Sequence, residues 1–112
     1  MTDAVIDQEH LSMLKEVMDD EFSVLLETFL IDGVERLGVL EATLGEGDSD
    51  AFFKAAHSLK GSSGNIGAMG LSDLCKTAEL KGREGDLSGM GQQLVKIKQE
   101  YDRVKEALNT LL

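Results

Sequence analysis

Apolar residues recur at intervals of three and four along most of the chain, which is the period of an amphipathic α-helix. Proline is absent, so nothing interrupts these stripes, while the 12 glycines supply places where helices can end. The two longest stripes are Phe22, Leu26, Phe29, Gly33, Leu37, Leu40 and Leu44, and Leu94, Ile97, Tyr101, Val104, Leu108 and Leu111. No strand is predicted, and the expected fold class is all-α.

Capping residues and glycines place the boundaries of five helices. The expected starts are Asp7, Asp19 or Asp20, Asp48, Met69 and Asp86. The expected ends are Met18, Gly45 and Gly47, Gly67, Arg83 after a turn weakened by Gly82, and the end of the chain. The inward residues of the three shorter helices are expected to be Leu11, Leu14 and Met18; Phe52, Ala56, Leu59, Ser63 and Ile66; and Leu71, Leu74, Cys75, Ala78 and Leu80.

Short connectors join these long stripes, which is typical of helices that run antiparallel to their neighbours. The connectors read GEGD at residues 45–48 and REGD at residues 83–86. The second to fifth helices are therefore predicted to form an antiparallel up-down four-helix bundle, with the short N-terminal helix packed over one end. Residues 1–112 are expected to form a single domain.

Composition and charge exclude several classes of function. Hydrophobic residues make up 42% and charged residues 29%, as in soluble globular proteins. The 21 acidic and 11 basic residues leave a net charge of -10, which repels nucleic acid. The chain has no apolar run of about 18 residues and no secretory signal at its start, so we expect a cytoplasmic protein without membrane contact. Cys75, the only cysteine, is expected to be a buried hydrophobe.

The segment AAHSLKGSSGNIGAMGL, residues 55–71, carries the candidate chemistry. At about 100° per residue, His57 lies about 140° from Phe52 on the solvent face of the predicted helix, and Gly61 and Gly64 share that face. Each interior glycine costs a helix about 1 kcal/mol relative to alanine, so a compensating gain is expected. Glycines beside an exposed imidazole would let a bulky group or another protein's backbone approach the His57 ring closely. A neutral imidazole nitrogen is a competent nucleophile, and Lys60 can place a positive charge near an anion bound there.

The string A-H-S-L-K-G-S-S-G-N-I-G-A followed by Leu71 resembles the signature of bacterial histidine phosphotransfer (HPt) domains, and the helix lengths agree over essentially the whole chain. The resemblance implies that His57 is the phosphorylated residue, that Lys60 stabilises the phosphoryl group, and that Gly61 clears the ring. It also implies that Gly67 ends the helix.

The resemblance continues into the next helix, where Leu71 and the pair Ala78, Glu79 match the family pattern. Many relatives carry leucine in place of Ala78. The glycines Gly82, Gly89 and Gly91 also depart from the pattern and are expected to loosen the later helices. The segment DDEFSVLLETFLIDG and the chain length are similar to small stand-alone phosphotransfer proteins of the HptB type.

By this resemblance the chain is a phosphocarrier and not an enzyme. His57 is expected to accept a phosphoryl group from a receiver-domain aspartate of a hybrid sensor kinase and to pass it to the aspartate of a response regulator. No cofactor is expected on this chain, since the receiver contributes the acidic pocket and magnesium. A monomer is expected.

Docking of the receiver is expected on the exposed side of the helix that carries His57. The residues expected to contact the partner are Phe53, Lys54, Gly61 and Gly64. Phe53 either offers an apolar contact to the partner or is tucked into the bundle, and both placements are open.

Three other interpretations compete with phosphotransfer. The glycines at 61, 64, 67 and 70 suggest a phosphate loop, but neither nucleotide-binding fingerprint fits because they follow a helix and no lysine stands in place. His10 is expected at the surface, and no third ligand is spaced to join it and His57 around a metal. A helical adaptor that binds a partner without phosphotransfer is the alternative function, and phosphorylation of His57 decides between the two.

Overall fold

The structure, a computed structural model, describes residues 5–112 and consists of five α-helices and one 3-10 turn in that range. The helices are α1 (Gln8–Met18), α2 (Phe22–Glu46), α3 (Ser49–Asn65), α4 (Met69–Arg83) and α5 (Met90–Asn109), and the 3-10 turn is η1 (Asp19–Glu21). Residues 5–112 contain no strand, so the all-α prediction is confirmed.

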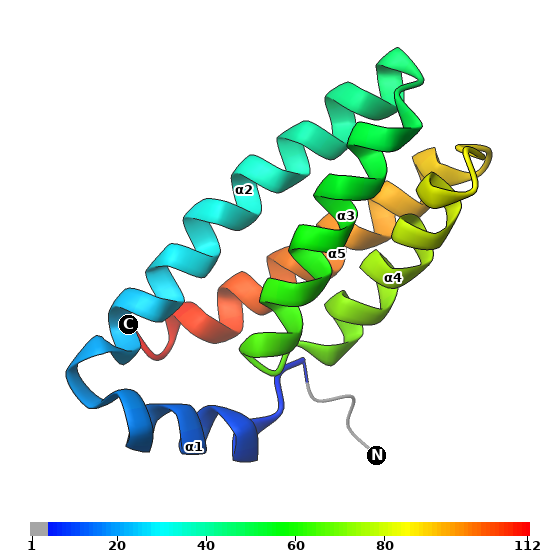
Figure 1. Cartoon of the computed structure of the whole chain (residues 1–112). Coiled ribbons are helices and arrows are strands. Elements are labelled where there is room, and N and C mark those ends of the chain that lie inside the picture. Colours follow the sequence, from blue (N-terminus) through cyan, green and yellow to red (C-terminus); the bar gives the residue numbers. More distant parts are fainter. Residues whose placement is uncertain (1–4) are drawn as a thin grey trace.

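Helices α2 to α5 form an antiparallel bundle, as predicted (Figure 1). The α2–α3 and α4–α5 connections lie at one end of the bundle, and α1 runs across the opposite end. The pairs α3–α4 and α2–α3 share the most extensive contacts. Within the described residues, no helix is long and apolar enough to cross a bilayer.

The predicted stripes form most of the core, with the largest fully buried side chains contributed by all four bundle helices and by Ile6. Two residues predicted to face inward are instead half-exposed. Leu80 lies about 180° around α4 from the buried Leu71 at about 100° per residue, so it cannot share that face. Leu111 follows Asn109, where α5 ends, and therefore leaves the stripe.

Two of the predicted helix caps are confirmed. The carboxylate of Asp7 accepts hydrogen bonds from the backbone N–H of Glu9 at 3.0 Å and of His10 at 3.2 Å, and Asp48 caps α3 by accepting from Ala51 N–H at 3.1 Å. These bonds satisfy backbone donors that the first helical turn leaves without partners.

The other predicted boundaries need correction. Asp19 and Asp20 form the 3-10 turn η1, and α2 begins at Phe22 without a side-chain cap. Asp86 does not cap α5, which begins at Met90; its carboxylate instead accepts bonds from the backbone N–H and the hydroxyl of Ser88. These local bonds, with Lys81, lower the pKa of Asp86 to about 2.

Glycines in the left-handed conformation follow the last turns of α2 and α3. Gly45 lies inside α2, contrary to prediction, and Gly47 with φ of 70° ends the helix in the left-handed conformation. Gly67 has φ of 84° and follows the last turn of α3, as predicted.

The connection between α3 and α4 also anchors α1. The backbone N–H of Asp7 donates to the carbonyl of Gly67 at 2.9 Å, and His10 Nε2 lies 2.7 Å from the carbonyl of Asn65. A carbonyl only accepts, so Nε2 of His10 carries the proton there. His10 is half-exposed, and its hydrogen bond attaches α1 to the end of the bundle. The sequence had predicted only that His10 lies at the surface.

Gly33 on α2 lies against the ring of Tyr101 on α5. A methyl group at Gly33 would overlap the Tyr101 ring, whose hydroxyl donates to the carbonyl of Leu30 at 2.6 Å. The absence of a side chain at Gly33 is what allows α2 and α5 to approach at this point.

Replacing Gly33 by alanine should therefore lower the free energy of unfolding by about 1–3 kcal/mol, the usual cost of overpacking a core. Gly38 on the same helix is exposed with no neighbour within 4 Å, so Gly38→Ala should instead raise stability by up to about 1 kcal/mol. Urea titrations of both variants measure this difference. Equal effects of the two substitutions would contradict the close packing at Gly33.

Candidate functional site

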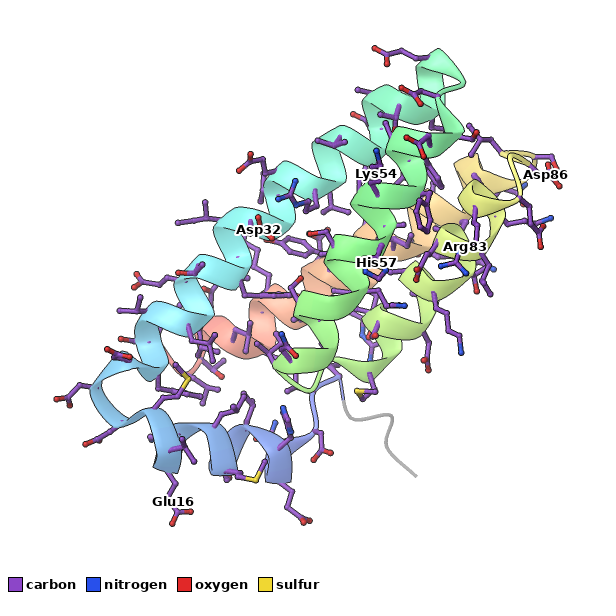
Figure 2. The ribbon with its side chains drawn as sticks, viewed as in Figure 1. Glu16, Asp32, Lys54, His57, Arg83 and Asp86 are labelled. Carbon is purple, nitrogen blue, oxygen red and sulfur yellow. The ribbon has the colours of Figure 1, made fainter. Side chains whose placement is uncertain are left out.

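His57 stands on α3 with its ring directed toward α4. Its side chain is 62% exposed, while its helix neighbours Ala56 and Leu59 are buried in the core. Figure 2 shows His57 and Arg83 on the same side of the bundle, on α3 and α4. The predicted placement of His57 on the solvent face is confirmed.

The partner of the imidazole is Glu79 of α4, whose side chain is only 3% exposed. Nδ1 of His57 lies 2.7 Å from Oε2 of Glu79, a distance typical of a charge-assisted hydrogen bond. Glu79 directly follows Ala78 in the buried stripe of α4, which turns its carboxylate inward against α3. The site thus pairs an exposed imidazole with a buried carboxylate.

Two cations surround the same carboxylate. Nζ of Lys60 lies 2.6 Å from Oε1 of Glu79, and a guanidinium nitrogen of Arg83 lies 3.5 Å from Oε2. Burial alone raises the pKa of Glu79 and is the largest single effect, but hydrogen bonds and charges from Lys60 and His57 together bring that pKa below its ordinary value. Glu79 is therefore a carboxylate at neutral pH.

The charge of Glu79 determines which nitrogen of His57 is nucleophilic. A carboxylate can only accept hydrogen bonds, so Nδ1 of His57 must be the donor. In the neutral imidazole the lone pair then lies on Nε2, on the ring's other side. The exposed His57 thus presents Nε2 as a nucleophile, held in one tautomer by Glu79.

Phe53 and Arg83 border the site on the side of α4. The centroids of the Phe53 and His57 rings are 6.2 Å apart, and the guanidinium carbon of Arg83 lies 5.1 Å from the Phe53 ring centroid. Phe53 is half-buried, between the two placements left open by the sequence. Its ring packs against the imidazole and has Arg83 over one face.

The remaining predicted site residues differ in how open their surroundings are. A methyl group at Gly61 would meet nothing within 4 Å, which agrees with the clearance predicted for this position. Gly64 is half-buried, and a methyl group there would lie 3.6 Å from the hydroxyl of Ser72 on α4. Lys54 is exposed and forms an ion pair with Asp50 at 3.1 Å.

Sequence reasoning assigned no role to Glu79 or Arg83. Glu79 was identified only as part of the family pattern, and Lys60 was expected beside the phosphoryl group, whereas its Nζ is paired with Glu79. The available signal was an acidic residue bordering the buried stripe of α4, since such a residue needs basic partners from a neighbouring helix.

Among residues 5–112, neither the cysteine nor the clustered acidic and histidine side chains form a second reactive centre. Cys75 is buried, and burial raises the pKa of its thiol to about 12, so it stays protonated and packs as a hydrophobe, as predicted. Within residues 5–112 no group of three or more His, Cys, Asp or Glu side chains is arranged to hold a metal.

The fold and the site define a class of protein, a helical bundle with an exposed nucleophilic histidine. Residues 24–107 match the sequence pattern of the Hpt domain family. The structure is similar to the crystal structure of histidine-containing phosphotransfer protein B (HptB) from Pseudomonas aeruginosa PAO1, with 38% identity and a TM-score of 0.94, over 97% of this chain and 95% of that chain. A search of curated protein sequences gave no match.

The chain belongs to the Hpt domain family, as the sequence motif predicted. The family carries out histidine phosphotransfer in phosphorelays, and its members are phosphocarriers rather than kinases.

The lowered pKa of Glu79 makes stability depend on pH. The unfolded chain binds a proton at Glu79 more readily than the folded chain, so the stabilisation is complete above the ordinary glutamate pKa of about 4.3 and is lost as the pH falls through the lower folded-state value. We expect Glu79→Gln to be less stable than the parent at pH 7, with a gap that narrows on acidification.

Urea unfolding of both proteins between pH 7 and pH 3 measures that gap. A gap that stays constant over this range would contradict the assignment of a charged Glu79.

Proposed function

We propose that this chain is a phosphorelay intermediate that accepts a phosphoryl group on His57 from a receiver-domain aspartate of a sensor kinase and passes it to the aspartate of a response regulator. The observation that carries this proposal is the largely exposed imidazole of His57, whose Nδ1 lies 2.7 Å from the carboxylate of the buried Glu79. Membership of the Hpt family and the similarity to HptB support it.

The proposed transfer is a displacement at phosphorus. The lone pair of His57 Nε2 forms the new P–N bond while the P–O bond to the receiver's aspartate breaks, and the aspartate leaves as a carboxylate with that electron pair. The proton stays on Nδ1, so the phosphorylated ring is formally cationic. Glu79, 2.7 Å from Nδ1, stabilises that positive charge, and the reverse displacement delivers the phosphoryl group to the next aspartate.

Lys60 has two roles in this proposal. Its Nζ neutralises Oε1 of Glu79 in the free protein, and its side chain is 31% exposed at the edge of the site. A flexible ammonium in that position reaches toward an incoming phosphoryl group while the carboxylate remains bonded to His57. We propose that the receiver supplies the acidic pocket and the magnesium ion.

Docking is proposed on the surface of α3 that surrounds His57. Phe53 and Lys54 lie one turn before the histidine, and Gly61 and Gly64 lie one and two turns after it. The open space at Gly61 allows the backbone of the receiver to approach the ring, and the half-exposed Phe53 offers an apolar edge.

His57→Gln should abolish transfer of acid-labile label from a panel of phosphorylated receiver domains, while the helical circular dichroism stays unchanged because the side chain is largely exposed. His10→Gln is the matched control: it loses the contact that anchors α1 but should retain labelling. Labelling of His57→Gln would refute the assigned site, and an unlabelled parent would favour the helical adaptor.

The variant Gly61→Gln tests whether Gly61 is needed to keep space open beside the His57 ring and is not needed for stability of the fold. Nothing lies within 4 Å of a methyl group at Gly61, and glutamine is a better helix former than glycine, so the variant should melt no lower than the parent. A side chain four residues after His57 stands beside the ring and should slow transfer and weaken receiver binding. Thermal melts and transfer rates on the same samples test this, and a parental rate would refute the clearance role.

A further inference from the structure

Helices α3 and α4 come into backbone contact at one point close to the site. Gly82 is buried, and a methyl group built there would lie 2.9 Å from Cα of Phe53 and 3.0 Å from its Cβ and its backbone N. Most of these are backbone atoms, which cannot swing aside as the tip of a side chain can. A residue larger than glycine at position 82 would therefore separate the two helices.

This contact lies one helical turn from the reactive bond. Phe53 precedes His57 by four residues on α3, and Gly82 follows Glu79 by three residues on α4. One turn of helix spans about 5.4 Å and is stiff, so a separation at Gly82 is transmitted to the hydrogen bond between His57 and Glu79. That bond measures 2.7 Å, and lengthening it by a few tenths of an ångström takes it beyond the charge-assisted range of about 2.7–2.9 Å.

The neighbouring residue strengthens the same contact. The guanidinium of Arg83 lies over the Phe53 ring at 5.1 Å from its centroid, while Gly82 meets the backbone of Phe53. The last turn of α4 thus touches Phe53 with both residues. The sequence predicted only that Gly82 loosens this turn. In the structure, the absence of a side chain at Gly82 allows α4 to approach α3 closely.

We propose that Gly82 is a positioning residue for phosphotransfer: the contact between Gly82 and Phe53 sets the spacing of α3 and α4 that keeps Glu79 bonded to Nδ1 of His57 and leaves Nε2 free to accept the phosphoryl group. This inference rests on the proposed function for its consequence, but the tautomer of His57 can be observed without any phosphoryl donor.

The test compares Gly82→Ala with Gly33→Ala, which crowds α2 against α5 away from the bond between His57 and Glu79. Both variants are made in a Gly38→Ala background, because that exposed position should add helix stability. The 15N chemical shifts of the His57 ring, at a pH where the ring is neutral, report which nitrogen carries the proton. The rate of phosphorylation by phosphoramidate reports nucleophilicity without a receiver.

We expect the parent and Gly33→Ala to hold the proton on Nδ1 of His57, and Gly82→Ala to shift toward a mixture of tautomers. A misplacement of about 1 Å costs up to about 100-fold in rate, so a shift of a few tenths of an ångström should slow phosphorylation of Gly82→Ala about three- to tenfold relative to Gly33→Ala.

An unchanged tautomer in folded Gly82→Ala would overturn the proposal, and so would equal rate losses in the two variants. If neither phosphoramidate nor any phosphorylated receiver domain labels the parent, the proposed function is refuted, while a tautomer shift in Gly82→Ala would still support the positioning of the imidazole by Gly82. If Gly82→Ala does not fold, the 15N shifts of the His57 ring in the parent test the premise of the proposal. A parent ring with its proton on Nε2, or with a mixture of tautomers, would overturn the proposal.

Discussion

Glu79 is a carboxylate enclosed between two helices, and a buried charge without partners costs several kcal/mol. Its three partners, His57, Lys60 and Arg83, come from α3 and α4 and lie within 3.5 Å of its oxygens. The site depends on the need of the Glu79 carboxylate for hydrogen-bonding and charged partners. Those partners place the imidazole of His57 and the ammonium of Lys60 at the same edge of the bundle. The apolar faces of α3 and α4 are buried in the common hydrophobic core of the bundle.

The same interaction explains how an otherwise ordinary surface histidine becomes a defined nucleophile. Free imidazole exchanges between two tautomers, whereas His57 donates from Nδ1 to an acceptor that has no proton to give. Nε2 keeps the lone pair of a largely exposed ring, and the space beside Gly61 is open. Glu79 also offers a fixed negative charge to a ring that becomes cationic on phosphorylation, so one residue orients the ground state and stabilises the product.

Much of the fold could be predicted because burial imposes a period on the sequence. The stripes of α2 and α5 follow that period, and the caps Asp7 and Asp48 form hydrogen bonds within three residues of themselves, which a local pattern describes well. Asp86 shows where such reasoning stops: aspartate is a good cap, but Ser88 two residues later captures its carboxylate in a turn. The solvent-facing position of His57 and Gly61 on α3 could likewise be predicted, because it follows from the rotation of about 100° per residue along a helix.

The role of Glu79 could not be predicted in the same way. His57 and Glu79 are 22 residues apart, and their bond depends on how closely α3 approaches α4. That distance is determined by contacts such as Gly82 against Phe53, which no periodicity describes, and a glycine in a helix reads locally only as a weak point. Lys60 was expected to stabilise the phosphoryl group, and its pairing with Glu79 could not be predicted because it depends on the same approach of the two helices.

The most direct measurement is the identity of the ring nitrogen that carries the phosphoryl group. The 15N-labelled protein would be phosphorylated by a receiver domain and examined by 31P and 15N NMR at alkaline pH, where phosphohistidine survives. Phosphorus bonded to Nε2 of His57 is the predicted result. Phosphorus on Nδ1, or on any residue other than His57, would contradict the role assigned to the buried carboxylate.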